Sequence, residues 1–319
     1  MTLESSNKSN PAVFSHIEIE ASNYLRIDTV KVVAESREGV GVFASSNVQI
    51  LNAWIHGKNQ FNRQAPVYTQ VSTLYGINVG DGSSNVVIEG NSVSDVQSSA
   101  YVFFGVSEIK VDANRCDWVA SDCFKFGGLD QATVTNNFGA QHIYASPSAH
   151  VDFMQGQGQV SNSVFRGNVA LMGNRSFQGL FFDDAEFDNL LFEDNLIYTA
   201  HNRGISVSSG RGIIARYNTV LRLAGSQKAT FSALPSGVSK SLTSKRTTLF
   251  QMMSVFLAPT SWHSGTSRKR RPITLVIIKT RRMVPSHRFL ISRLLLVLLP
   301  TAKLAVSYTH LTLPTNDQV

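Results

Sequence analysis

The sequence predicts an all-β chain, a single-stranded right-handed parallel β-helix of about eight coils over residues 21–226. Three observations carry this prediction. A series of asparagines recurs at a regular spacing, a short β-prone run precedes each asparagine, and a second strand with alternating apolar residues precedes most of these runs. Two or three short strands in each unit are too short for a helical repeat and fit one coil of a β-helix.

The asparagine series sets the length of the repeat. Successive gaps of 23, 23, 31, 27 and 23 residues indicate a unit of 23 with insertions of eight and four. A tight turn between strands needs a left-handed backbone, which asparagine tolerates, and stacked side chains can hydrogen-bond along a ladder. We therefore interpret the series as structural and not catalytic: Asn91, Asn114, Asn137, Asn168, Asn195 and Asn218.

The second strands can be aligned to predict which outward residues share a column. Anchoring each strand on its first inward residue gives the inward column Ile77, Phe124, Val151, Leu180 and Ile205. The outward column beside it is then Asn78, Lys125, Asp152, Phe181 and Ser206. This alignment predicts that Lys125 and Asp152 are stacked neighbours within reach of an ion pair, and that Met154 and Asp183 share the next column with Ser208.

Polar residues gather where the repeat carries its insertions, which we expect at 145–149 and 175–177. Loops inserted beside a polar face of a regular scaffold often shape a binding site. Asp152, His150 and Lys125 are the catalytic candidates, because a cation beside a carboxylate suits proton transfer on a sugar. The candidates for substrate binding are Gln155, Asp183, Asp184, His201 and Arg203.

Each of these candidates also has a structural interpretation. Lys125 and Asp152 can form a surface ion pair, which is common and weak. Asp183 and Asp184 can form a turn, and the residues at 201 and 203 can belong to a solvated loop. No metal site is predicted and the cofactor stays unknown, although neighbouring carboxylates can bind Ca²⁺.

Two cysteines, Cys116 and Cys123, are seven residues apart. They can pair across adjacent coils in an oxidising compartment, or they can be small buried residues with free thiols. We expect free thiols, because buried unpaired cysteine is common.

The composition changes near residue 227. Before residue 228 there are 15 Lys and Arg against 21 Asp and Glu, a balance of −6, whereas the rest has 14 against one, or +13. The basic net charge is thus an average of two unlike pieces and does not indicate nucleic-acid binding. Residues 227–304 have the character of a frame-shifted reading, and 305–319 resemble a translated sequencing adapter. The alternative is a natural basic tail that binds nucleic acid or anionic lipid.

The non-native tail is expected to be disordered or poorly packed, whereas residues 1–20 are a lead-in to the β-helix. The lead-in has no apolar signal-peptide core. The most apolar run, at 289–299, is interrupted by Arg293 and is too short to span a bilayer.

Several strings between residues 76 and 222 resemble bacterial right-handed parallel β-helix repeat proteins of the pectate lyase-like superfamily: HVDFMQ, SNSVFRGN, QGLFFDD, LLFEDNLIYTAHNRGISV and ARYNTV. The resemblance implies polysaccharide lyase or mannuronan C5-epimerase chemistry on alginate or pectin-like polymers. Only Asp152 fits the epimerases' YGFDPH-like motif, and Asp183 with Asp184 would match the Asp pair of polygalacturonases. Arg203 replaces the second histidine of an AHxHG-like strand.

The predicted function is that of a carbohydrate-active β-helix protein, a lyase or epimerase acting on an acidic polysaccharide. Its expected partner is the polysaccharide, with no nucleic acid and no membrane, and its expected location is extracellular or at the cell surface. The alternative is a non-catalytic β-helix such as an adhesin, a tail-spike segment or a secreted surface protein. A long apolar stripe on an outer face would favour this alternative.

Overall fold

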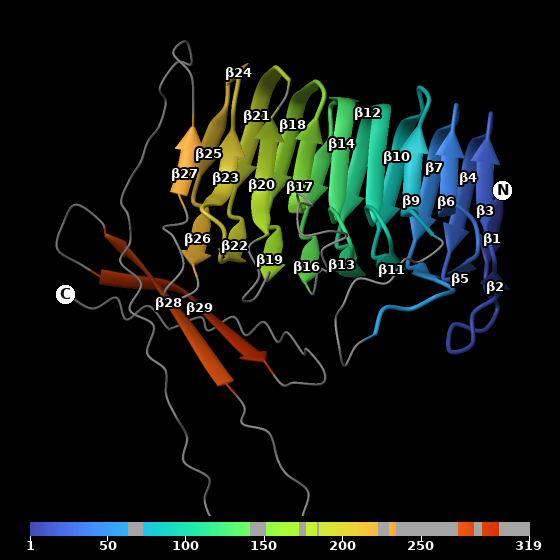
Figure 1. The fold of residues 1–319 in the computed structure, drawn as a ribbon, viewed down its shortest axis with the longest axis horizontal. Coiled ribbons are helices and arrows are strands. Elements are labelled where there is room, and N and C mark those ends of the chain that lie inside the picture. The colour runs from blue at the N-terminus through green and yellow to red at the C-terminus, as the bar shows by residue number, and fades with distance from the viewer. Residues whose placement is uncertain are drawn as a thin grey trace, which may run out of the picture. The chain divides into compact units, whose positions relative to one another are not determined.

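The computed structural model describes residues 1–62, 73–140, 151–171, 177–183 and 185–222, and beyond them only the strands at 230–233, 274–283 and 289–299. Every regular element in these residues is a β-strand. The chain divides into two units, Met1–Thr243 and Ser244–Val319. In the first unit the strands stack as the rungs of a parallel β-solenoid of about eight turns (Figure 1), which confirms the predicted fold class.

The rungs form three faces, of which two belong to one continuous sheet of 18 described strands. The first face is built from β3 (Ile17–Glu20), β6 (Glu38–Phe43), β9 (Tyr75–Gly80), the first half of β12 (Tyr101–Asp112), β14 (Phe124–Asp130), β17 (Asp152–Gln157), β20 (Gln178–Asp183), β23 (Arg203–Val207) and β27 (Thr230–Ala233). The second face is built from β1 (Thr2–Glu4), β4 (Asn23–Asp28), β7 (Ser46–Leu51), β10 (Ser84–Glu89), the second half of β12, β15 (Thr133–Thr135), β18 (Val160–Arg166), β21 (Phe187–Glu193), β24 (Gly210–Arg211) and β25 (Ile214–Arg216).

The third face is a separate sheet of nine described strands. It comprises β2 (Val13–Phe14), β5 (Lys31–Ala34), β8 (Trp54–Gly57), β11 (Ser92–Val96), β13 (Arg115–Val119), β16 (Phe138–Ala140), β19 (Val169–Leu171), β22 (Leu196–Thr199) and β26 (Thr219–Arg222). The segment predicted as a lead-in supplies strands of all three faces, since β1 pairs with β4, β2 with β5 and β3 with β6. At the other end, β27 pairs with β23 although it follows the predicted boundary at 226.

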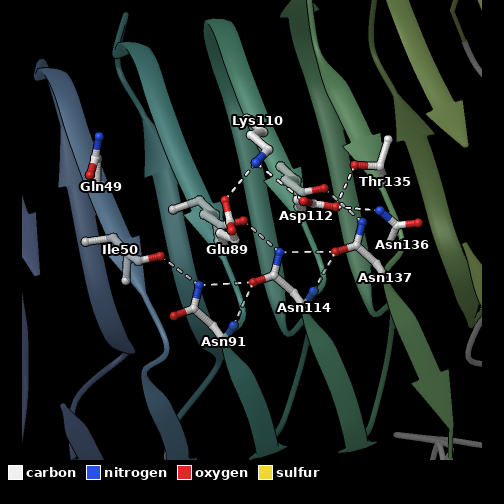
Figure 2. Close-up of polar contacts among 12 residues, drawn as sticks. Gln49, Ile50, Glu89, Asn91, Lys110, Asp112, Asn114, Thr135, Asn136 and Asn137 are labelled. Atoms are coloured by element: carbon white, nitrogen blue, oxygen red, sulfur yellow. Dashed lines mark hydrogen bonds and ion pairs between the residues drawn. The ribbon is translucent and has the colours of Figure 1, made fainter. Parts of the chain in front are cut away.

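The asparagine series forms one continuous ladder inside the solenoid, as predicted (Figure 2). The Asn91 Nδ2 group donates to the Ile50 carbonyl at 2.9 Å and to Asn114 Oδ1 at 3.0 Å, and Asn114 Oδ1 also accepts the Asn91 backbone N–H. The same contacts repeat along the ladder to Asn218. Each side chain therefore satisfies buried backbone groups on the preceding rung and donates to the asparagine side chain of the following rung.

The left-handed turn that we expected at these asparagines lies one residue earlier. Positive φ angles occur at the residue before each ladder asparagine, including Ala113 at 55° and Asn136 at 55°, and the ladder residues themselves are not among the positive-φ positions. The expectation that the ladder asparagine takes the left-handed conformation is wrong. Its side chain instead points into the solenoid, where it forms hydrogen bonds with buried backbone groups at the turn.

The core changes from aliphatic to aromatic along the solenoid. Valines and isoleucines fill the N-terminal rungs, whereas phenylalanines fill those from β12 onward. The Phe124 ring stacks on Tyr101 with centroids 4.7 Å apart, and Phe165 contacts Phe182 and Phe192 at 5.0 and 5.2 Å. Ring contacts between successive rungs add to the apolar burial that holds the rungs together.

The corner between the third and first faces pairs a large residue with a small one. A Cβ atom at Gly179 would lie 2.6 Å from Ile197, and one at Gly204 would lie 2.3 Å from Val220. In one coil the order is reversed, because the ring of Phe153 fills the space beside Gly139 at 2.5 Å. In each of these pairs a large side chain fills the space that the glycine leaves, as close packing requires.

A disulfide occupies the same corner between β13 and β14. Cys116 and Cys123 are both fully buried and bonded, with Cα atoms 5.6 Å apart. The expectation of free thiols is therefore wrong. Cys116 is in register with Val93 and Gly139 on the two neighbouring rungs.

The second unit is described only by β28 (Thr274–Met283) and β29 (Phe289–Leu299), which pair antiparallel. This pairing differs from the parallel rungs of the first unit. The frame-shifted and adapter origins of 227–304 and 305–319 stay predictions.

Candidate functional site

The repeat carries its extra residues at one corner of the solenoid. The connections from β8 to β9, β16 to β17 and β19 to β20 all run from the third face to the first and are the longest of their kind in the first eight turns. They contain residues 63–72, 141–150 and 172–176, which lie outside the described residues, as do the expected insertions at 145–149 and most of 175–177. The outer surface of the first face beside this corner is the candidate site.

The observed register corrects the predicted alignment of this face. Phe124 pairs with Met154 and Lys125 pairs with Gln155, so the strand at β17 is shifted by three residues from its predicted position. Two columns of outward-facing residues run along this face. The column that directly follows the first inward residue of each strand is Asn78, Val102, Lys125, Gln155, Phe181 and Ser206. Lys125 and Asp152 are therefore not stacked neighbours, and that prediction is wrong.

Asp152 lies at the start of its strand and is fully buried, contrary to the expected outward orientation. It is in register with Gln178, and its backbone N–H donates to Asp122 Oδ1 at 3.0 Å. Asp122 and Gln178 are buried as well. These three residues form a buried polar column beneath the corner, which suits a positioning role better than direct contact with a polymer.

Lys125 has a different environment from every other basic side chain described. In the described part of the chain, each of the others contacts a carboxylate or an aromatic ring: the partner is Glu89 for Lys110, Trp54 for Lys31 and Phe181 for Arg203. Lys125 is half-buried on the outer surface, and no described carboxylate lies within ion-pair distance of its ammonium. An unpaired cation on a sheet face is a binding group for an anion.

The second outward column lies two residues further along each strand and contains an aromatic residue and a carboxylate. Phe104 pairs with Gly127, and Gln157 pairs with Asp183 on the rungs that follow. Met154 faces inward opposite Leu180, so its predicted place beside Asp183 is wrong. Asp183 itself does lie on the outer surface, where it is half-buried.

The remaining candidates lie at the end of this face or outside the described residues. The guanidinium of Arg203 lies 4.8 Å from the centroid of the Phe181 ring, and its backbone N–H donates to His201 Nδ1 at 3.1 Å. His150 and Asp184 fall outside the described residues. Sequence reasoning missed Asp122, Gln178 and Phe104; the repeated position two residues before the first inward residue could have indicated the first two.

Charged side chains on the second face are paired with one another. Lys110 Nζ lies 2.7 Å from Glu89 and 3.4 Å from Asp112 (Figure 2). Glu193 lies 2.6 Å from both Arg166 and Arg216. Burial tends to raise the pKa of Glu193, but the two guanidiniums outweigh it and hold that pKa below its ordinary value. Each of these charged groups therefore has an oppositely charged partner on a neighbouring strand or on its own.

The described residues contain no group of three or more His, Cys, Asp or Glu side chains placed to hold a metal ion. Within the same residues, no helix is long and apolar enough to cross a membrane.

The fold and this surface define a class: a parallel β-solenoid with a polar outer face beside a corner of inserted loops. Solved structures similar to it are pectate lyase-like β-helix proteins. An alginate lyase from Paenibacillus sp. str. FPU-7 is 15% identical over 70% of this chain and 82% of its own, with a TM-score of 0.43. An endo-xylogalacturonan hydrolase from Aspergillus tubingensis is 15% identical over 70% of this chain and 67% of its own, with a TM-score of 0.40.

A third similar structure is the surface protein and adhesin PfbA of Streptococcus pneumoniae, at 12% identity, 64% of this chain, 65% of its own and a TM-score of 0.31. At such identities the likeness concerns the fold alone. No protein-family model matches the chain, and no curated protein matches it.

Proposed function

We propose that this protein binds an acidic polysaccharide along the outer surface of the first face and acts on it as a lyase or a C5-epimerase. The observation that carries the proposal is Lys125 on the outer surface of this face, where the residues in register with it on the two neighbouring rungs, Val102 and Gln155, are neutral. A sugar carboxylate is the anion that this arrangement suits, because the amides of Gln155 and Gln157 beside it can bind hydroxyl groups.

Both reactions begin with loss of the proton next to the uronate carboxylate. That proton is removed more easily when a cation neutralises the carboxylate, and this is the role proposed for Lys125. His150 is the proposed base, because it precedes the start of β17 by two residues. Asp152 would then be a positioning residue from its buried place, and Asp183 a substrate-binding group. Return of a proton to the same carbon from the opposite face of the ring leads to epimerisation. Cleavage of the adjacent C–O bond, with a proton passing to the leaving oxygen, leads to an unsaturated product.

The test uses the full chain with alginate and pectate. Ultraviolet absorbance reports unsaturated products, and NMR reports inverted uronates. Lys125→Met should lower either activity by about 100-fold or more, as is typical when a charge-stabilising group is removed. The matched control is Lys110→Met, which removes a lysine of the second face and should leave activity unchanged. If the wild-type protein produces neither signal on either polymer, the enzyme proposal is wrong.

A non-catalytic role as an adhesin or surface protein is the second candidate. It is favoured by two apolar outer columns on the third face, one of which runs through Ala140, Leu171, Tyr198 and Leu221. Such a stripe suits contact with another protein or another copy of the chain. Sedimentation of the full chain, compared with Leu171→Lys, would detect self-association through this stripe.

An extracellular or surface location is part of the proposal. The buried disulfide between Cys116 and Cys123 supports it, because such bonds form and persist in oxidising compartments.

A further inference from the structure

We infer that Phe104 and Lys125 together form one uronate subsite, in which the sugar ring stacks on the phenylalanine and its carboxylate binds the lysine. This inference rests on the proposed function and adds to it a defined place for one sugar residue. Phe104 was not among the residues that the sequence indicated.

The position of the Phe104 ring is set by a glycine on the next rung. A Cβ atom at Gly127 would lie 2.4 and 2.7 Å from two ring carbons of Phe104, so the ring occupies the space that a side chain at 127 would need. The ring thus covers the outer surface of β14 instead of projecting into solvent. Phe104 is still 38% exposed, which leaves part of its surface open to a ligand.

Lys125 lies on the strand that this ring covers. Residues 125 and 127 are two apart on β14, so their Cα atoms are about 7 Å apart. A pyranose that covers the ring over Gly127 therefore has its edge next to the lysine. The apolar C–H face of a sugar is complementary to an aromatic ring, and a carboxylate on that edge is complementary to the ammonium.

Two amides border the same place on the following rung. Gln155 pairs with Lys125, and Gln157 follows it on β17. Neither amide makes a hydrogen bond to any described residue. A ring, a cation and two amides on neighbouring strands provide an apolar surface, a charge and hydroxyl ligands, which are the three parts that a uronate requires.

The experiment measures binding of trigalacturonate and trimannuronate to the full chain by calorimetry, with galactotriose, mannotriose and polyglutamate as comparison ligands. Phe104→Ala should weaken binding of a uronate trimer by about tenfold, whereas Phe104→Tyr should retain it. Lys125→Met should remove the preference for the acidic over the neutral trimers. Trp54→Ala, which removes a 52% exposed aromatic residue beside Lys31 on the third face, is the matched control and should change nothing.

The outcomes separate the subsite from the wider proposal. If Lys125→Met abolishes uronate binding and Phe104→Ala does not change it, the subsite is wrong and the polysaccharide proposal stands. If Phe104→Ala weakens binding but Lys125→Met still prefers the acidic over the neutral trimers, the role of Lys125 is wrong both in the subsite and in the proposed reaction. Equal binding of polyglutamate overturns the sugar assignment, and no binding of any saccharide by the wild type overturns both. Thermal unfolding of each variant, monitored by circular dichroism, must match that of the wild type.

Discussion

Replacing one asparagine of the ladder should destabilise the solenoid far more than replacing an asparagine on its surface. Asn114→Ala removes the donor to the Ile88 carbonyl at 2.8 Å and the acceptor for the Asn91 backbone N–H at 3.0 Å. The two side chains next to it in the ladder each keep one other partner, since Asn91 Nδ2 still donates to Ile50 and Asn137 Oδ1 still accepts the backbone N–H of residue 114. The main loss is therefore two buried backbone groups.

A buried backbone group left without a partner costs about 1–3 kcal/mol, so the two together predict a loss of about 4 kcal/mol in the free energy of unfolding. Urea unfolding of the full chain, followed by circular dichroism, measures it. The control is Asn23→Ala, which removes one exposed hydrogen bond to Asn47 and should cost about 0.5 kcal/mol or less. If the free energies of unfolding of the two variants lie within about 1 kcal/mol of each other, the buried ladder does not stabilise the rungs more than a surface hydrogen bond does.

Three further predictions concern stability. Gly179→Ala should cost about 1–3 kcal/mol in urea unfolding, because its Cβ would lie 2.0 Å from the Gly204 carbonyl oxygen; a cost near zero would contradict the corner packing. The pKa of Glu193 is lowered in the folded state, so its contribution is complete above pH 4.5 and is lost as the pH falls further; unfolding that is equally easy at pH 5 and pH 3 would refute this. Replacing Cys116 and Cys123 together by serine should cost about 2.5 kcal/mol from loop entropy, and an unchanged midpoint with or without reductant would exclude it.

The repeat was predictable because it depends on local chemistry. A 23-residue spacing of asparagines after β-prone runs directly reflects one buried side chain per coil, and the ladder follows from it. The position of the left-handed residue was harder to predict, because the residue before each asparagine varies: it is Ala113 in one coil and Gly167 in another. Four of these six residues are Gly, Asn or Asp, which tolerate a left-handed backbone, but Ala113 and Tyr217 are not of these types. The position is therefore marked in only part of the repeats, whereas the ladder asparagine recurs in all six.

The register of β17 could not be read from its own sequence. In the coils at β9, β20 and β23 a glycine stands directly before the first inward residue, and it marks the corner. In the coil at β17 that position holds Phe153, so alternation placed the wrong residue inside. Phe153 fits there because Gly139, on the third face, has no side chain to occupy the same space. A compensation between residues on different faces leaves no pattern in the local sequence. The resulting shift of three residues in the register separates Asp152 from Lys125.

The observed register of β17 also explains why the polar residues of the first face divide into two sets. A carboxylate two residues before the inward position, as in Asp122 and Asp152, is buried under the corner, and that of Asp122 accepts a backbone N–H of the next rung. A polar residue after that position, as in Lys125 and Gln155, lies on the outer surface. On the second face, the ion pairs of Lys110 with Glu89 and of Arg216 with Glu193 join successive rungs. An unpaired cation that persists on the one face bordered by inserted chain is therefore better explained by a ligand than by the stability of the stack.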